Sequence, residues 1–372
     1  MEQMKIDRYL AKTGKKRVSH FVFGSLAPLK PTIVFDTFWR FAAERQNIFF
    51  KKLAGEHYPW TVDPILRKYK FTNAYRACDR VSQYLIRNVI QEGVQSPEEI
   101  FFRILLFKVF NSIETWKLLK EAFTEISYHN YSFLAYDMVL TRAMKEGRSI
   151  FSAAYIMPSD KSVFNFKKKH RNYLRLIERM IEDDVPQRLA DITSMKKAFE
   201  LLLSYPMIGN FLAYQFITDI NYSGLTNFSE MEFVIPGPGA RDGIRKCFSE
   251  SGGLSDSDII RLVTDRQQLE FERRGIKFKY LYTRPLQLID CQNLFCEIDK
   301  YSRIAHPEIK GTSSRQRIKH VYRPNGASIQ YWFPPKWRIN DYIKDFQGHA
   351  EGKSQVPHAT IQTRGNKDRS HL

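Results

Sequence analysis

The stretch from Phe38 to Val81 constrains the fold most, because aromatic side chains alternate there with charged and amide side chains. Apolar residues recur at helical spacing up to Ala42, and Glu44 and Arg45 follow directly. An apolar stripe of this period predicts a helix that is buried along one face. Charges at the end of such a stripe need partners if they are buried, because removing the partner of a buried charge is strongly destabilising.

The second half of this stretch carries a further charged pair. Arg76 and Asp79 lie three residues apart in a predicted helix from Asn73 to Gln91, so they would share one face of that helix. A structural ion-pair cluster at a helix junction is one interpretation of these charges, and a polar reaction site is the other. The residues alone favour neither.

Three motifs give the chain a resemblance to a known family. They are Phe38–Gln46, Tyr69–Val81 and the run Leu288–Tyr301, which ends in Cys-Glu-Ile-Asp-Lys-Tyr. They resemble the opening and closing motifs of the alpha-glutamyl/putrescinyl thymine pyrophosphorylases, also called amino acid:DNA transferases, which are encoded mostly by DNA viruses of bacteria. A similar helical domain is attached to 5-hydroxymethyluracil DNA kinases. Ile298 departs from the family, which has an aromatic residue there. We expect the closing run to be helical and to pack against the opening motif.

The resemblance implies a mostly α-helical domain of the helix-hairpin-helix, DNA-glycosylase-like type. It also implies that the protein acts on an extruded 5-hydroxymethyluracil that carries a phosphate or pyrophosphate in double-stranded DNA. An amine, from an amino acid or a polyamine, would displace the pyrophosphate and form a C–N bond at the 5-methylene carbon. The alternatives are a non-catalytic DNA-binding module that partners a separate kinase, and a base-excising glycosylase.

Such a reaction requires three kinds of group from the protein. Stacking surfaces hold a flipped base, positive charge and backbone donors stabilise the departing pyrophosphate, and a carboxylate accepts the proton of the amine. Mg²⁺ is the one cofactor that this chemistry suggests, and the sequence contains no coordination motif for it. The candidates are Trp39, Trp60 and Tyr75 for stacking, Arg45, Asn73, Arg76, Gly237, Gly239 and Arg241 for the phosphates, and Asp219, Glu44 and Asp79 as catalytic carboxylates.

The segment Tyr205–Tyr214 resembles the hairpin of DNA glycosylases, in which a glycine-containing turn points backbone N–H groups at a DNA phosphate. Gly209 permits a close approach, and the N-terminus of the helix after it favours an anion. Met207 stands where the pattern has its first glycine, so a tight turn between packed helices is an equally good interpretation. Asp219 comes broadly where glycosylase-like folds place a catalytic aspartate, and a structural hydrogen bond is its alternative role.

Two further stretches bear on phosphate binding. The turn Gly237–Ala240 leads into a helix that carries Arg241, which favours either a phosphate site or a plain connection between helices. Lys167, Lys168 and Lys169 form a basic run ahead of an amphipathic helix. Such a run either contacts the DNA backbone or forms a solvated face.

The chain is strongly basic, with a formal net charge of +18 over 372 residues. Residues 1–31 carry +5 and residues 310–372 carry +8, so residues 32–309 hold only the remaining +5. We therefore predict a basic N-terminal arm (1–31), a helical domain (32–309) and a basic C-terminal extension (310–372) that is largely disordered after about residue 346. Double-stranded DNA is the expected partner of these flanks.

Several classes of protein are disfavoured by what the sequence lacks. Its four cysteines form neither a disulfide framework nor a paired zinc motif, and no apolar run reaches the length of a membrane span. No phosphate-binding loop of the Gly-x-x-x-x-Gly-Lys-Ser/Thr type occurs, so a nucleotide or DNA kinase would be a separate partner. We expect a soluble protein in the cytoplasm of a bacterial or phage-infected cell.

Overall fold

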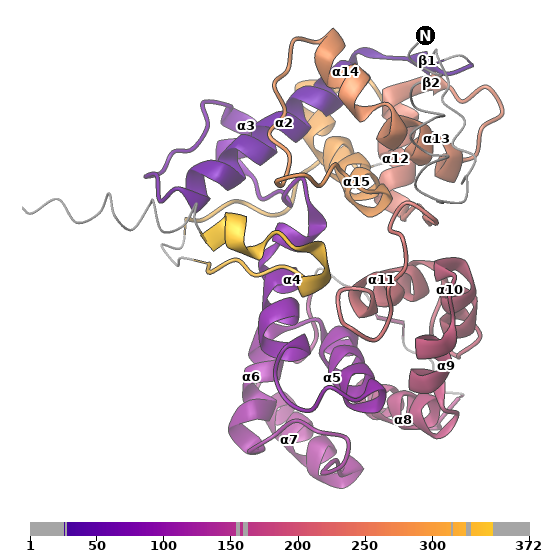
Figure 1. Ribbon diagram of the computed structural model, residues 1–372. Helices are drawn as coiled ribbons and strands as arrows, with labels where there is room; N and C mark the ends of the chain where they lie inside the picture. The colour runs from indigo at the N-terminus through magenta and orange to yellow at the C-terminus, as the bar shows by residue number, and fades with distance from the viewer. Residues whose placement is uncertain are drawn as a thin grey trace, which may run out of the picture.

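The computed structural model describes residues 26, 28–153, 157–158, 163–313, 315–324 and 329–344. Over these residues the protein is mostly helical with one two-stranded sheet, which confirms the predicted mostly α fold class (Figure 1). None of the described helices is long and apolar enough to cross a membrane. Most of the predicted basic arm, and the stretch predicted to be disordered after about residue 346, lie outside the described residues.

The helices follow one another along the chain, and the two strands β1 and β2 pair antiparallel. In chain order the elements are β1 (Lys30–Pro31), α2 (Ile33–Leu53), α3 (Pro64–Lys68), the 3₁₀ turn η1 (Arg76–Cys78), α4 (Arg80–Leu85), the π-helical turn η2 (Ile86–Ile90), α5 (Pro97–Phe110), α6 (Ile113–Ala122), α7 (Phe133–Lys145), α8 (Lys169–Glu182), α9 (Val185–Asp191), α10 (Met195–Leu203), α11 (Asn210–Ile220), α12 (Pro238–Cys247), β2 (Phe248–Glu250), α13 (Asp256–Asp265), α14 (Gln267–Arg273), α15 (Leu288–Ala305) and the 3₁₀ turn η3 (Pro335–Trp337).

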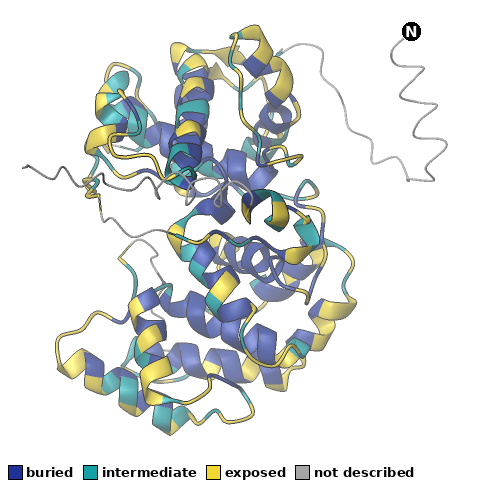
Figure 2. Ribbon diagram, turned by 60° about the vertical axis from the view of Figure 1, so that its left-hand side comes forward, coloured by how far each residue is buried: buried dark blue, intermediate teal, exposed yellow. Residues whose placement is uncertain are grey.

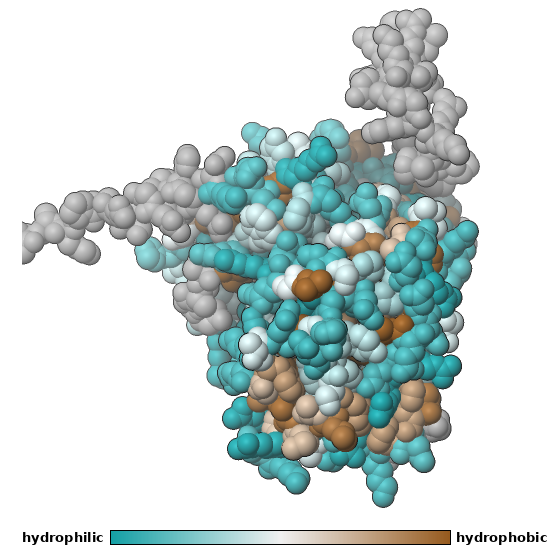
Figure 3. Space-filling model, turned by 60° about the horizontal axis from the view of Figure 1, so that its bottom comes forward, coloured by the Kyte–Doolittle hydropathy of each residue, from teal (hydrophilic) through white to brown (hydrophobic). Residues whose placement is uncertain are grey.

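These elements form two halves: one combines two stretches that are far apart in the sequence, and the other is a continuous stretch. The terminal half, at the top of Figure 1, combines α2 and α3 with α12 to α15, so it unites residues 30–68 with residues 238–305. The central half below it contains α4 to α11, residues 80–220, with α5 packed against α8, α9 and α11. Buried residues run through the interior of both halves (Figure 2). Seen from below, the molecule presents a mostly hydrophilic face with an apolar area along its lower edge (Figure 3).

Helices α12 and α15 approach each other closely at Gly243. A Cβ atom on this glycine would lie 1.9 Å from the carbonyl oxygen of Phe295, so only glycine permits the observed spacing of the two helices. Helix α2 packs on the same pair, and the ring centroids of Phe38 and Phe295 are 4.7 Å apart. This contact confirms that the closing motif is helical and packs against the opening motif.

Replacing Gly243 by alanine is expected to lower the free energy of unfolding by about 2 kcal/mol or more, because the added methyl group must push the two helices apart. Thermal unfolding followed by circular dichroism should show a melting temperature lower by several degrees. Gly224→Ala is the matched control, since its added Cβ would meet no atom within 4 Å. Equal melting temperatures for the two variants would contradict this account of the helix contact.

The helix predicted from Asn73 to Gln91 is wrong in its first half, because α4 begins only at Arg80. The backbone N–H of Asn73 donates to Oδ1 of Asp79 at 2.8 Å, and Nδ2 of Asn73 donates to the carbonyl of Cys78 at 2.8 Å. Asparagine and aspartate side chains that bond nearby backbone groups in this way compete with helix formation. Arg76 and Asp79 therefore do not share a helix face.

Candidate functional site

Arg76 lies in a buried polar triad between the two halves. Its guanidinium binds the carboxylate of Asp219 through two bonds, Nη1 to Oδ1 at 2.6 Å and Nη2 to Oδ2 at 2.9 Å. Nζ of Lys108 lies 3.0 Å from Oδ2 of the same carboxylate. The arginine comes from η1, the lysine from α5 and the aspartate from the last turn of α11, so the Arg76–Asp219–Lys108 triad joins three elements. None of the three side chains is more than 7% exposed.

The charges of the triad decide what its carboxylate can do. Burial alone would raise the pKa of Asp219, but the charges of Arg76 and Lys108 outweigh burial and hold that pKa below its ordinary value. A carboxylate held in its ionised form by two cations is a weak base. The backbone N–H of Arg76 also donates to Oδ1 of Asp290 on α15 at 2.8 Å. The geometry therefore gives the triad a positioning role, in which it fixes the η1 turn between α11 and α15.

A second polar cluster adjoins the residues that lead into η1. Arg45 on α2 donates from Nε to the carbonyl of Thr72 at 2.8 Å and from Nη2 to Oδ1 of Asn73 at 3.1 Å. Its side chain is buried, and no carboxylate among the described residues lies within 4 Å of it. Burial accordingly lowers the pKa of Arg45, and the charge of Asp79 is the largest influence that opposes it. The guanidinium of Arg45 therefore has only neutral hydrogen-bond acceptors, the carbonyls of Phe71 and Thr72 and Oδ1 of Asn73.

Asp79 completes this cluster and differs electrostatically from Asp219. Burial raises the pKa of Asp79 to about 7, while the N–H bond from Asn73 lowers it and the charge of Glu297 raises it further. No cation of the described residues lies within 4 Å of this carboxylate, and its side chain is only partly buried. A carboxylate that exchanges a proton near neutral pH suits general base catalysis. We refer to Arg45, Asn73 and Asp79 as the Arg45–Asp79 cluster.

An aromatic corner borders the Arg45–Asp79 cluster. Nζ of Lys52 lies 4.4 Å from the ring centroid of Trp60 and 5.1 Å from that of Tyr322. Burial, together with the charge of Arg45, lowers the pKa of Lys52 to about 8. Trp60 is partly exposed, and its Nε1 donates to the carbonyl of Glu56 at 2.6 Å. Of the three predicted stacking residues, Trp60 is the one with an accessible face.

The other two predicted stacking residues lie in the core. Trp39 is fully buried, with its ring against Phe38 at 5.0 Å and against Phe271 at 4.8 Å. Tyr75 is 1% exposed, and its hydroxyl donates to the carbonyl of Arg284 at 2.5 Å. Their rings are covered by the protein, so neither presents a surface on which a base can stack in this conformation.

The predicted phosphate turn at the start of α12 is closely packed. A Cβ on Gly237 would lie 3.0 Å from the ring of Phe211, and one on Gly239 would lie 3.2 Å from Sγ of Cys296. Arg241 is exposed, and its Nε lies 3.9 Å from Asp256. Both glycines thus permit close packing against α11 and α15, and a phosphate role for this turn stays a prediction.

The remaining predicted DNA contacts are dispersed. Gly209 is the residue before α11, and Met207 has a φ of +63°, a left-handed conformation that normally favours glycine. Met207, which replaces the first glycine of the glycosylase hairpin pattern, thus has a backbone conformation that glycine favours. Phosphate binding by this turn stays a prediction. Nζ of Lys168 donates to Thr141, and Lys169 lies over a phenylalanine ring, which leaves Lys167 as the exposed member of its run.

Glu44, the third predicted catalytic carboxylate, is partly buried and has no hydrogen-bond partner among the described residues.

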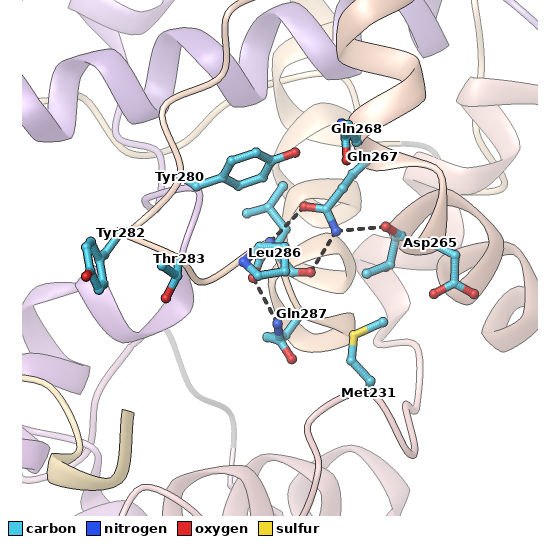
Figure 4. A pocket seen from close by; sticks show the side chains of 11 residues that line it. Met231, Asp265, Gln267, Gln268, Tyr280, Tyr282, Thr283, Leu286 and Gln287 are labelled. Carbon is cyan, nitrogen blue, oxygen red and sulfur yellow. Dashed lines mark hydrogen bonds between the residues drawn. The ribbon is translucent and has the colours of Figure 1, made fainter. Parts of the chain in front are cut away.

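A hollow of about 430 Å³ opens in the terminal half near the triad (Figure 4). Tyr280, Thr283 and Met231 line it, and Gln267 closes one wall by bonding both the N–H and the carbonyl of Leu286. The lining also includes Gln287, whose backbone N–H donates to Asp290, the acceptor of the Arg76 N–H. Two hydrogen bonds that meet at Asp290 therefore connect the lining of the hollow to Arg76 of the triad. No group of three or more metal-ligating side chains occurs in the described part of the chain.

The sequence predictions missed three residues of these clusters. Lys108 stands in a very apolar helix, Asp290 caps the start of α15, and Lys52 follows a buried stripe. A charged residue inside an otherwise apolar run is a detectable signal, and Lys108 carries it. The partners of Asp290 and Lys52 lie far away in sequence, so no local pattern marks these two.

Comparison with known proteins finds a family model and a phage protein that each match most of this chain. The family model described as the helical domain of 5-hmdU DNA kinase matches residues 32–311, which include both clusters. A 5-hmdU DNA kinase of Bacillus phage SP10 is 27% identical over 288 residues, covering 72% of this chain and 45% of the phage protein. The chain therefore spans less than half the length of that relative. No solved structure matches it.

Proposed function

This chain belongs to the family of the 5-hmdU DNA kinase helical domain, and on that premise we propose that it modifies thymine-derived bases in DNA. The proposed substrate is 5-hydroxymethyluracil in double-stranded DNA, activated as a phosphate or pyrophosphate ester. The proposed reaction is displacement of the pyrophosphate by an amine. The name of the phage relative, 5-hmdU DNA kinase, supports the choice of base.

The reaction forms one bond and breaks one. The amine nitrogen attacks the 5-methylene carbon, the bond from that carbon to the pyrophosphate oxygen breaks, and pyrophosphate departs with the bonding electrons. The amine proton passes to the carboxylate of Asp79. Arg45 stabilises the negative charge that develops on the leaving group, and the triad holds the η1 turn, which Asp79 follows directly.

The absence of any described cation within 4 Å of the Asp79 carboxylate supports this assignment, because Asp219 by contrast is paired with both Arg76 and Lys108. The Asp79 pKa of about 7 lies close to the pH of a cell, whereas Asp219 is held ionised by two cations. A general base is most effective when its pKa is near the working pH. We therefore transfer the role of base from Asp219 to Asp79 and leave the Asp219 carboxylate to position Arg76.

The test is mass spectrometry of nucleosides from duplex DNA containing 5-hydroxymethyluracil, its monophosphate or its pyrophosphate. Each duplex is incubated with the protein, amino acids, polyamines and Mg²⁺. A new adduct together with released pyrophosphate is the expected result. Free base and abasic sites would identify a glycosylase instead, and unchanged nucleosides with tight DNA binding would identify a module that serves a kinase.

The pH dependence of the transfer rate follows from Asp79. Its carboxylate must be ionised to accept a proton, so the rate should rise about tenfold per pH unit below pH 7 and level off above it. Single-turnover rates between pH 5 and pH 8.5 with a saturating amine excess measure this profile. A rate that does not change between pH 5 and pH 8 would rule out Asp79 as the base.

A further inference from the structure

Part of the described C-terminal extension pairs with the end of α3 and the two residues after it. Tyr69 and Val321 form an antiparallel bridge, the N–H of Lys70 donates to the carbonyl of His320 at 2.9 Å, and the N–H of Tyr322 donates to the carbonyl of Lys68 at 2.9 Å. We propose that these paired segments, residues 67–70 and 315–323, form the surface that binds the phosphate backbone of duplex DNA. This inference rests on the proposed function and locates the partner surface for it. We name the two segments the basic ladder.

The charge of the basic ladder is of one sign. All seven of its lysines and arginines are exposed, and none forms an ion pair within 4 Å with a described residue. Neither segment contains an aspartate or glutamate. Such a concentration of unneutralised charge favours a polyanion, because each phosphate contact releases condensed counterions. The cations are Arg67, Lys68, Lys70, Arg315, Arg317, Lys319 and Arg323.

The basic ladder is held in place at several points rather than lying loosely on the surface. Before it, Oδ1 of Asp242 accepts bonds from Thr312 and from the N–H of Ser313 at 3.0 Å. Within it, Nη1 of Arg303 donates to the carbonyl of Arg317 at 3.0 Å, and the ring of Tyr322 stacks on that of Tyr58 at 6.3 Å. Its cations are thus displayed on a fixed backbone, which lowers the entropy lost on binding.

The C-terminal segment of the basic ladder lies outside the matched family domain, whereas residues 67–70 lie inside it. Residues 315–323 lie beyond residue 311, where the match to the family model ends. The segment nevertheless borders the Arg45–Asp79 cluster, because Tyr322 contacts Lys52 beside Arg45. A duplex bound along the ladder would therefore lie next to the proposed reaction site. The basic run at Lys167–Lys169 is a poorer surface, because only one of its three lysines, Lys167, is exposed.

The test compares two triple variants that remove the same charge. The ladder variant is Arg315→Gln, Arg317→Gln and Lys319→Gln, and the control is Lys117→Gln, Lys145→Gln and Arg188→Gln, three exposed cations on α6, α7 and α9. Fluorescence anisotropy with a 30-base-pair duplex, about three turns long, measures Kd between roughly 50 and 200 mM salt. The ladder variant should bind at least tenfold more weakly at 100 mM salt, and its slope of log K against log salt should be shallower by about 2–3.

The possible outcomes distinguish a failure of the proposed binding surface from a failure of the proposed function. If the control weakens binding as much as the ladder variant, or if neither weakens it, the basic ladder is not the binding surface, although the proposed function stands. If the wild-type protein does not bind the duplex at all, both proposals fail. Circular dichroism melts of both variants establish that any loss of binding is not a loss of folding. A second ladder variant, Lys68→Gln with Lys70→Gln, removes charge from the partner segment and should also weaken binding.

Discussion

Replacing Asp219 by asparagine is expected to lower the free energy of unfolding by about 3–5 kcal/mol, because Arg76 and Lys108 would remain buried without a counter-charge. For a domain of this size the melting temperature should fall by about 4–8 °C. Circular dichroism or differential scanning calorimetry at neutral pH measures the change. The effect should be nearly constant between pH 6 and pH 8, because the pKa of Asp219 lies below its ordinary value and the carboxylate is ionised throughout that range.

Lys108→Met is the matched comparison for this variant. It removes one cation and leaves a one-to-one pair between Arg76 and Asp219, so the loss of stability should be clearly smaller than in Asp219→Asn. The alternative for Asp219 is the catalytic role that its position in the sequence first indicated. An asparagine variant that melts like the wild type but has lost all transfer activity would restore that role and remove the positioning role proposed above.

Replacing Asp79 by asparagine should lower the transfer rate at least 100-fold, because the amide cannot accept the amine proton. The same change should raise stability above neutral pH. The pKa of Asp79 is raised to about 7 in the folded protein, so its stabilising contribution is present below its ordinary value near 4 and is lost as the pH rises through 7. Asparagine removes this loss, and the gain in melting temperature should be larger at pH 8 than at pH 5.

Two measurements decide this prediction. Transfer assays on Asp79→Asn and on Asp191→Asn, which changes an exposed carboxylate on α9, separate loss of the base from loss of a surface charge. Melting curves of Asp79→Asn at pH 5 and pH 8 test the burial of the carboxylate independently of activity. If the Asp79→Asn protein keeps its transfer activity, Asp79 is not the general base. If it is less stable than the wild type at pH 8, burial does not raise the pKa of Asp79 in the way described.

The sequence identified the members of the two polar clusters better than it predicted their partners. Arg45, Asn73, Arg76, Asp79 and Asp219 were all predicted as site residues, and hydrogen bonds join Arg45 to Asn73 to Asp79 and Arg76 to Asp219. The sequence could not pair Arg76 with Asp219, because 143 residues separate them and the fold alone brings them together. Composition likewise identified aromatic residues without showing which faces they expose.

The predicted helix over residues 73–79 failed for a different reason. Its spacing of apolar and charged residues is helical, but Asn73 and Asp79 bond the backbone between them and stabilise a turn. That turn lets Arg76 and Asp79 point to separate clusters, one positioning and one available for proton transfer. The sequence therefore shows helical spacing together with an asparagine and an aspartate that can bond the backbone and oppose a helix. Here this conflict lies at the centre of the candidate site.

The division of the chain between the two halves has a consequence for synthesis on the ribosome. The central half is one continuous segment and can fold as soon as residues 80–220 have emerged. Helix α2 emerges earlier, yet its apolar face is covered by α12 and α15, which follow the central half in the chain. The nascent protein must therefore carry the exposed stripe of α2 while the whole central half is synthesised, and closure of the terminal half waits for the closing motif. Chaperone dependence during synthesis should concentrate on the first described helix of the chain.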